Sequence, residues 1–254
     1  MPLQRWIKSL VCLCVLLSWG ASHAVAEGGA GSGALQEEAS QDKASAAVLA
    51  MHTWIKNSKA FEFQSSYRIS DPVLGMSSQG SVHFRVQRPN SFRVDVVSGG
   101  KREVFISDSE LFTIYRPQKN VYAQLKADET ILGTMFKAIG GLTLQARLVE
   151  FFWTVDYLSI GAEDIKVTAG GTSQIRGTTC RKYRIARATE VWDVWIAQGA
   201  TPFACRVVST TRDQAASTVQ SNELTWTLQP SFDAATFEFK PPANAKKVSM
   251  SGLQ

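Results

Sequence analysis

Histidine is scarce in this sequence, and the motifs carried by most hydrolases and metalloenzymes are missing. Beyond the N-terminal region there are two histidines, His52 and His83. A zinc site takes three or four ligands, and no HExxH or CxxC pattern is present, so no metal site is predicted. No GxSxG nucleophile elbow occurs either. We therefore expect a protein that is not an enzyme, with no catalytic residues, no metal and no cofactor.

Blocks of a single charge sign are also missing. The formal net charge is +5 at pH 7 in a chain of 254 residues, and no segment is dense in lysine and arginine. A protein dedicated to binding nucleic acid usually has such a segment. The sequence therefore argues against nucleic acid as a partner.

A hydrophobic run long enough to cross a membrane is absent, since a transmembrane helix takes about 20 apolar residues. The run at residues 10–19, LVCLCVLLSW, is shorter. It follows Arg5 and Lys8 and precedes AVA at residues 24–26, which is the pattern of a secretory signal peptide. We expect residues 1–26 to be cleaved, with an uncleaved anchor as the less favoured alternative. The mature chain would then have no transmembrane helix.

Cysteine is also rare, and cleavage would leave only Cys180 and Cys205. In an oxidising compartment they could form one disulfide. A meander of three strands over residues 180–187, 191–197 and 203–210 puts both side chains on one face, with a strand between them. That separates them by about 10 Å, whereas a disulfide needs Cα atoms within about 7 Å. A bridge requires the middle strand to end early, so both outcomes remain open.

The mature chain begins with a Gly-rich stretch, residues 27–41, which predicts a flexible linker. Asp42 can then cap a helix that runs to about residue 58. Its apolar stripe comprises Ala47, Val48, Met51, Trp54 and Ile55. Residues 42–254 are expected to form a single domain.

After this helix the hydrophobic period changes to two, as in RVDVV at residues 93–97. About ten or eleven such strands follow at hairpin spacing, so neighbours should be antiparallel. A twisted sheet of this size curls and creates a concave face. Residues 130–155 interrupt the strands with two apolar helical segments, which brings the helices to about three. The predicted fold class is mainly β with α: a curved antiparallel sheet capped by helices.

The strand LFTIY at residues 111–115 is apolar on both faces, which raises the question of what covers them. We predict that the insert helices, or a ligand between helices and sheet, cover one face. A tryptophan-bearing strand, residues 191–197, is expected to contribute as well. The predicted groove and lid residues are Phe112, Ile114, Met135, Phe136, Phe151, Phe152 and Trp195. Ordinary core packing is the alternative for each.

Five segments occur in an order that resembles a known group of proteins. They are SSQGSVHFRVQRPNSFRVDVV, ISDSELFTIYRPQKNVYAQ, IRGTTCRKYRI, VWDVWIAQGATPFACRVVST and FEFKPPANAKKV. Over residues 43–248 the chain resembles a family of predicted periplasmic proteins of unknown function. That family is related in fold to the carriers and receptors that move lipoproteins to the outer membrane.

This resemblance implies a periplasmic location and an unclosed β-barrel capped by helices. It also implies an apolar cavity for acyl chains, without catalytic residues or metal. In the carriers an arginine on a sheet strand helps to hold the lid shut, and Arg93 stands at a comparable place.

The functional hypothesis is a non-catalytic periplasmic protein that binds a lipid, an acyl chain or a lipoprotein in an apolar groove. The alternative is an envelope interaction or sensing module that docks a protein partner and fills its cavity with its own side chains.

Overall fold

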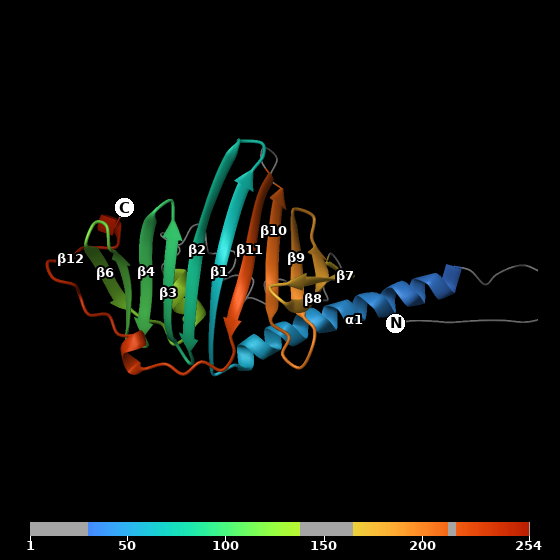
Figure 1. Ribbon diagram of the computed structural model, residues 1–254, viewed down its shortest axis with the longest axis horizontal. Helices are drawn as coiled ribbons and strands as arrows, with labels where there is room; N and C mark the ends of the chain where they lie inside the picture. Colours follow the sequence, from blue (N-terminus) through green and yellow to red (C-terminus); the bar gives the residue numbers. More distant parts are fainter. Residues whose placement is uncertain (1–29, 138–164, 213–216, 254) are drawn as a thin grey trace, which may run out of the picture.

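The protein is described by a computed structural model over residues 30–137, 165–212 and 217–253. Its main feature is one curved sheet with the strand order β12-β6-β5-β4-β3-β2-β1-β11-β10-β9-β8-β7 (Figure 1). The strands are β1 (Ala60–Asp71), β2 (Met76–Gln87), β3 (Ser91–Ser98), β4 (Lys101–Asp108), β5 (Leu111–Arg116), β6 (Val121–Lys126), β7 (Lys166–Ile175), β8 (Thr178–Ala186), β9 (Glu190–Ala197), β10 (Ala204–Arg212), β11 (Ser217–Thr227) and β12 (Lys246–Lys247). The mainly β, open-sheet prediction is confirmed, since β12 and β7 lie at opposite ends of the order and do not pair.

The alternating sequence pattern gives the sheet two chemically different faces. We call the apolar one the inner face. One of its rows runs Phe63, Phe84, Val94, Phe105 and Ile114 across five neighbouring strands, all buried. The adjacent row points the other way, on what we call the outer face, and includes the polar pair His83 and Asp95. Successive side chains of a strand point to opposite faces, so the alternation in the sequence produces this separation directly.

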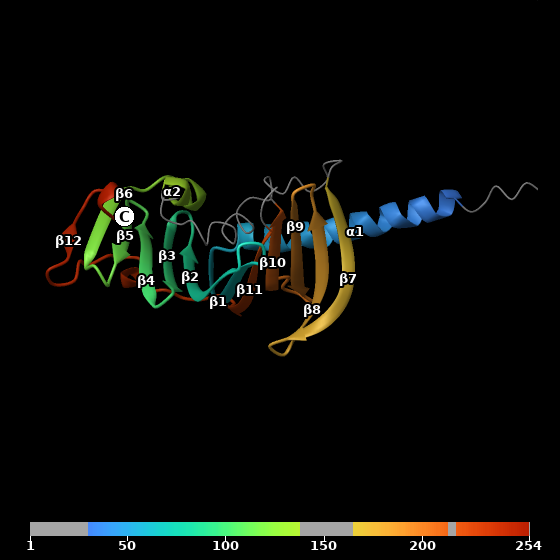
Figure 2. The ribbon, with the colours of Figure 1, turned by 90° about the horizontal axis from the view of Figure 1, so that it is seen from above.

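Two α-helices lie among the described residues, α1 (Ala30–Asn57) and α2 (Ile131–Lys137), rather than about three. Figure 2 shows both on the same side of the sheet. The side chains of α1 that are buried against the inner face recur at helical spacing: Ala44, Val48, Met51 and Ile55. α2 adds Ile131 and Met135 to the same core. The second predicted helix of the insert falls outside the described residues, as does the predicted signal peptide.

The predicted flexible linker is wrong over residues 30–41, because α1 already begins at Ala30. The glycines of this stretch, Gly31 and Gly33, fall in the first turn of the helix, where the backbone N–H groups have no partner within the helix in any case. The next residues, ALQEEA at 34–39, are mostly strong helix formers. Glu37 also forms an ion pair with Lys166 of β7 at 2.7 Å.

A C-terminal strap, which we define as residues 228–245, connects β11 to β12 on the side of the sheet opposite to α2 (Figures 1 and 2). It contains the 3-10 turn η1 (Ala234–Thr236), and a second such turn, η2 (Ser251–Leu253), follows β12. The ring of Phe239 packs against Tyr115 and Tyr122, with centroid distances of 5.5 and 5.1 Å. The strap thus covers the Tyr115 end of LFTIY on the outer side, whereas Leu111 is 44% exposed there. The sequence did not predict this contact. On the inner side, α2 joins the core.

The two cysteines form a disulfide with a Cα–Cα distance of 6.6 Å. β9, the middle strand, ends at Ala197, the residue directly opposite Cys180. The register between β9 and β10 also shifts at Cys205. The side chain of Ala197, a single methyl group, lies in the same buried cluster as both cysteines. An early strand end, a bulge and a small residue thus permit a bridge that a regular meander would not.

Candidate binding sites on the two faces of the sheet

The centre of the inner face is a cluster of aromatic rings. Phe63 lies 4.8 Å from both Phe84 and Trp226, measured between ring centroids. Trp226 in turn packs edge-on against Trp54 of α1 at 5.3 Å. Aromatic pairs at these distances contribute about 0.5–1.5 kcal/mol each beyond the area that they bury. This cluster fixes the C-terminal half of α1 against β1 and β11.

A second aromatic group lies toward β5, where the sequence predicted a groove. Phe112 is fully buried, and its ring lies 5.7 Å from Phe92 and 6.5 Å from Phe105. Ile114 and Met135 are buried in the same core cluster. The structure therefore brings together three of the predicted groove residues. Phe151, Phe152 and the side chain of Phe136 lie outside what the structure describes.

Trp195, also predicted for the groove, lies on the outer face instead. The strand period places Trp192 on the inner face, where it is buried, so Trp195 three residues later points the opposite way. Its ring lies between two cations, with Lys182 Nζ 5.0 Å and Arg206 Cζ 5.4 Å from the centroid. Neighbouring Asp193 could have indicated this orientation, because β9 carries its charged side chain on the same face.

Arg93 also lies on the outer face, opposite to α2, and does not reach a lid on the inner face. Its Nε donates a hydrogen bond to Asp95 Oδ2 at 3.0 Å. Residues of one strand two positions apart share a face, and Asp95 is two residues further along β3. The structure thus moves Arg93 from the predicted groove to a polar site that the sequence did not identify.

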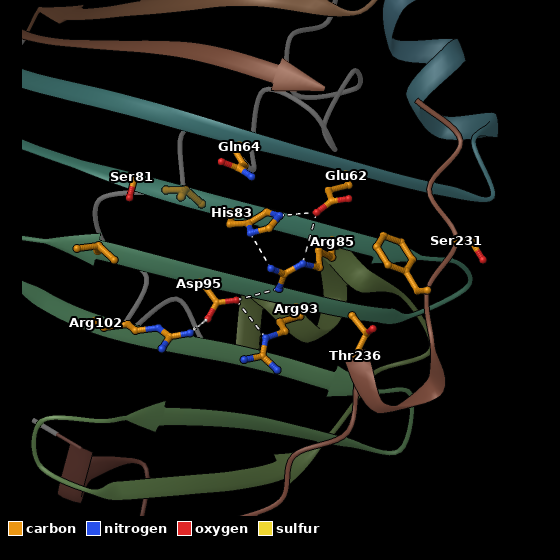
Figure 3. Close-up of a pocket in the computed structure, with 13 residues that line it drawn as sticks. Glu62, Gln64, Ser81, His83, Arg85, Arg93, Asp95, Arg102, Ser231 and Thr236 are labelled. Carbon is orange, nitrogen blue, oxygen red and sulfur yellow. Dashed lines mark hydrogen bonds and ion pairs between the residues drawn. The ribbon is translucent and has the colours of Figure 1, made fainter. Parts of the chain in front are cut away.

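This polar site is a pocket of about 640 Å³ between the outer face and the C-terminal strap (Figure 3). Strands β1 to β4 supply its floor, and the strap supplies Ser231, Phe232 and Thr236. The lining residues are Glu62, Gln64, Ser81, Val82, His83, Arg85, Arg93, Asp95, Val97, Arg102, Ser231, Phe232 and Thr236.

A chain of polar contacts runs across the pocket floor. Arg85 Nη2 donates to His83 Nδ1 at 2.7 Å, and His83 Nε2 lies 2.5 Å from Glu62 Oε1. Because a guanidinium group only donates, His83 Nδ1 must accept, and the ring proton is on Nε2. Both ring nitrogens of His83 are therefore engaged within the network.

Asp95 is the centre of the network, because three arginines converge on its carboxylate. The hydrogen bonds come from Arg85 Nη1 at 3.1 Å, Arg93 Nε at 3.0 Å and Arg102 Nη2 at 2.6 Å. Burial alone would raise the pKa of Asp95. The hydrogen bonds and charges of Arg93 and Arg102 outweigh that effect and hold the pKa below its ordinary value. Asp95 is therefore a carboxylate at neutral pH.

Among the residues that the structure describes, no group of three or more histidine, cysteine, aspartate or glutamate side chains could hold a metal ion. Within the same residues, no helix has the length and apolar character needed to cross a membrane.

Comparison with known proteins gives one family match. The sequence model of a family described as "Predicted periplasmic protein (DUF2092)" matches residues 44–251. No curated protein sequence matches the chain.

Solved structures with a similar fold are distant in sequence. LprF from Mycobacterium bovis is 11% identical with a TM-score of 0.47, over 80% of this chain and 98% of that one. A chain of the Pseudomonas aeruginosa MucA/MucB complex is 12% identical with a TM-score of 0.44, over 74% of this chain; the match spans 59% of that chain's length. A LolA superfamily protein from Nitrosomonas europaea is 9% identical with a TM-score of 0.38, over 77% and 97%. At these values the similarities carry no functional argument.

Proposed function

The chain belongs to the DUF2092 family of predicted periplasmic proteins, and from this premise we propose that it binds a lipid or acyl chain between its inner face and its helices. The family confirms the periplasmic location predicted from the sequence. We propose both the apolar ligand and a role without catalysis.

The observation that supports this function is the continuous apolar inner face. Buried apolar side chains extend across it from Ala123 of β6 to Val167 of β7. Within the described chain, two helices are available to cover this surface, and α2 has only seven residues. Burial of each CH₂ group contributes about 0.8 kcal/mol, so about ten methylenes of an acyl chain would supply about 8 kcal/mol. Such binding needs no covalent chemistry.

The direct test is native mass spectrometry of protein purified from the periplasm, together with displacement of a fluorescent fatty acid by an unlabelled one. We expect a co-purified lipid and saturable displacement. If no lipid co-purifies and no fatty acid is displaced, lipid binding is rejected.

Two neighbouring valines of β3 provide a matched pair of variants. Val96 is buried on the inner face with 8% of its surface exposed, whereas Val97 is 39% exposed on the outer face. Val96→Asp places a carboxylate beside the proposed acyl chain, which we expect to weaken fatty-acid binding about tenfold or more. Val97→Asp should leave fatty-acid binding unchanged. Equal effects of the two substitutions would place the ligand elsewhere.

A second candidate function is docking of an envelope protein, with the cavity filled by the protein's own side chains. The closed packing of the inner face favours it, because Phe63, Phe92 and Phe112 are completely buried. Crosslinking in the periplasm that recovers one stoichiometric partner, together with lipid-free protein, would support this function over the first.

A further inference from the structure

The outer-face pocket lies on the side of the sheet away from the proposed acyl site, and its chemistry is different. We propose that it is a separate binding site for a polar ligand that carries a phosphate group. The observations that support this are the charge on its floor, the hydrogen-bond donors that remain unused, and the hydroxyl groups on its wall.

The charge on the pocket floor is not balanced. Three guanidinium groups, on Arg85, Arg93 and Arg102, face two carboxylates, on Glu62 and Asp95. One positive charge is left over even while His83 is neutral. A network that served only to join neighbouring strands would need no such excess. Here the excess faces a pocket rather than a packed interior, so it is available to an anion.

Arg93 keeps most of its hydrogen-bond donors unused. A guanidinium group has five N–H donors, and within the described chain Arg93 donates only through Nε, to Asp95. Its side chain is 25% exposed, and Arg102 beside it is 48% exposed. The terminal nitrogens of Arg93 point away from Asp95 in Figure 3. Guanidinium groups match the geometry of phosphate oxygens and bind them in pairs of hydrogen bonds.

The C-terminal strap forms the opposite wall of the pocket and adds neutral groups. Ser231 and Thr236 carry hydroxyls that can donate to phosphate oxygens, and Phe232 provides an apolar surface. Phe232 is held by an edge-on contact with Phe237 at 5.3 Å between ring centroids. A volume of about 640 Å³ falls within the usual range for small-molecule sites, about 300–1,000 Å³. The ligand therefore has room for an organic portion beside its phosphate.

The test is calorimetric titration of the full mature chain with inorganic phosphate and with glycerol 3-phosphate, and cosedimentation with phosphatidylglycerol vesicles. We expect saturable binding of at least one of these probes, and tighter binding of glycerol 3-phosphate than of phosphate. Binding of the vesicles alone would identify the ligand as a lipid headgroup, whereas binding of the soluble probes would identify a free phosphate compound. Binding of none of them tighter than about 1 mM would overturn the proposal.

A matched pair of arginine variants locates the site. Arg93→Gln removes the central cation of the pocket, and we expect it to weaken probe binding about tenfold, because a charged hydrogen bond is lost. The control is Arg184→Gln, since Arg184 also pairs with an aspartate, Asp193, but lies on β8 outside the pocket. The control should bind like the unmodified chain. Equal weakening in both variants would indicate a nonspecific charge effect and reject the site.

A substitution on the strap tests the site independently, in case Arg93→Gln disturbs folding. Thr236→Val keeps the side-chain shape and removes one hydroxyl, so we expect about threefold weaker binding with an unchanged melting temperature. Unchanged binding in this variant would show that the strap does not form part of the site. Fatty-acid displacement by the same variants should stay normal, because all of these residues lie on the outer face.

Discussion

At the residue scale, Arg88 joins the end of α1 to the sheet. It follows β2, and its Nη2 and Nε donate to the carbonyl oxygens of Ile55 and Ser58 at 3.0 and 3.1 Å. The last carbonyl groups of a helix have no partner within the helix and carry partial negative charge, so a cation is favourable there. Burial lowers the pKa of Arg88, but a guanidinium group remains charged at neutral pH.

We predict that Arg88→Met lowers the free energy of unfolding by about 2 kcal/mol, since it removes two charged hydrogen bonds to backbone carbonyl groups. Guanidinium chloride denaturation would measure this. Arg181→Met is the control, because Arg181 also donates to a carbonyl oxygen, that of Gly170, but is exposed. Its effect should stay within about 0.5 kcal/mol. Equal losses in the two variants would mean that the contact with α1 adds no stability.

At the scale of elements, the disulfide links β8 to β10 across the end of β9. The cysteines are 25 residues apart in sequence. In the chain-entropy model, closing a loop of this length destabilises the unfolded chain by about 3.5 kcal/mol. We therefore predict that Cys180→Ala with Cys205→Ala lowers the free energy of unfolding by about that amount.

The same experiment has an internal control. A reducing agent should lower the denaturation midpoint of the unmodified chain to that of the double variant, and it should leave the double variant unchanged. If reduction does not shift the denaturation midpoint of the unmodified chain, the three strands β8, β9 and β10 are held together by their hydrogen bonds and the buried cluster alone.

The elements also show which parts of the fold a sequence can predict. Phe61 and Phe63 alternate with polar residues, and such a local pattern is enough to assign strand, face and burial. The face on which Trp195 lies could be assigned only relative to its neighbours on the same strand, the buried Trp192 and the charged Asp193. The sequence of the strap shows no helix or strand period. The strap is held by single contacts between residues far apart in sequence, such as Phe239 and Tyr122. The outer pocket could not be predicted for this reason.

At the scale of the whole molecule, the sheet separates two kinds of surface. The inner face gathers apolar side chains from α1, α2 and the strands, whereas the outer face gathers charge around Asp95 on β3 and Asp193 on β9. These two strands are separated by β2, β1, β11 and β10 in the sheet. Asp95 pairs with arginines of β2, β3 and β4, whereas Asp193 pairs with Lys182 and Arg184 of β8. Asp95 and Asp193 are therefore centres of separate charge networks in different parts of the sheet.

Both centres should make the stability of the fold depend on pH in the acid range. Burial alone would raise the pKa of Asp193, but its hydrogen bonds and charge interactions with Arg184 and Lys182 hold it below the ordinary value, as in Asp95. An unfolded aspartate has a pKa of about 3.9, so the unfolded chain takes up these protons first as the pH falls. The two groups therefore contribute their full stability above about pH 5 and lose it as the pH falls through their folded-state values.

We predict a melting temperature that is nearly constant from about pH 7 to pH 5 and falls below about pH 4. Asp95→Asn with Asp193→Asn should lower the melting temperature at neutral pH, because the arginines lose a charged partner, and should flatten the fall in acid. Glu238→Gln is the control, since Glu238 is exposed and pairs with the exposed Lys240, and it should keep the original slope. Calorimetry at a series of pH values would measure all three proteins. An acid slope in the double variant as steep as in the unmodified chain would assign the acid sensitivity to other carboxylates. The lowered pKa values of Asp95 and Asp193 would then make no measurable contribution to the stability of the sheet.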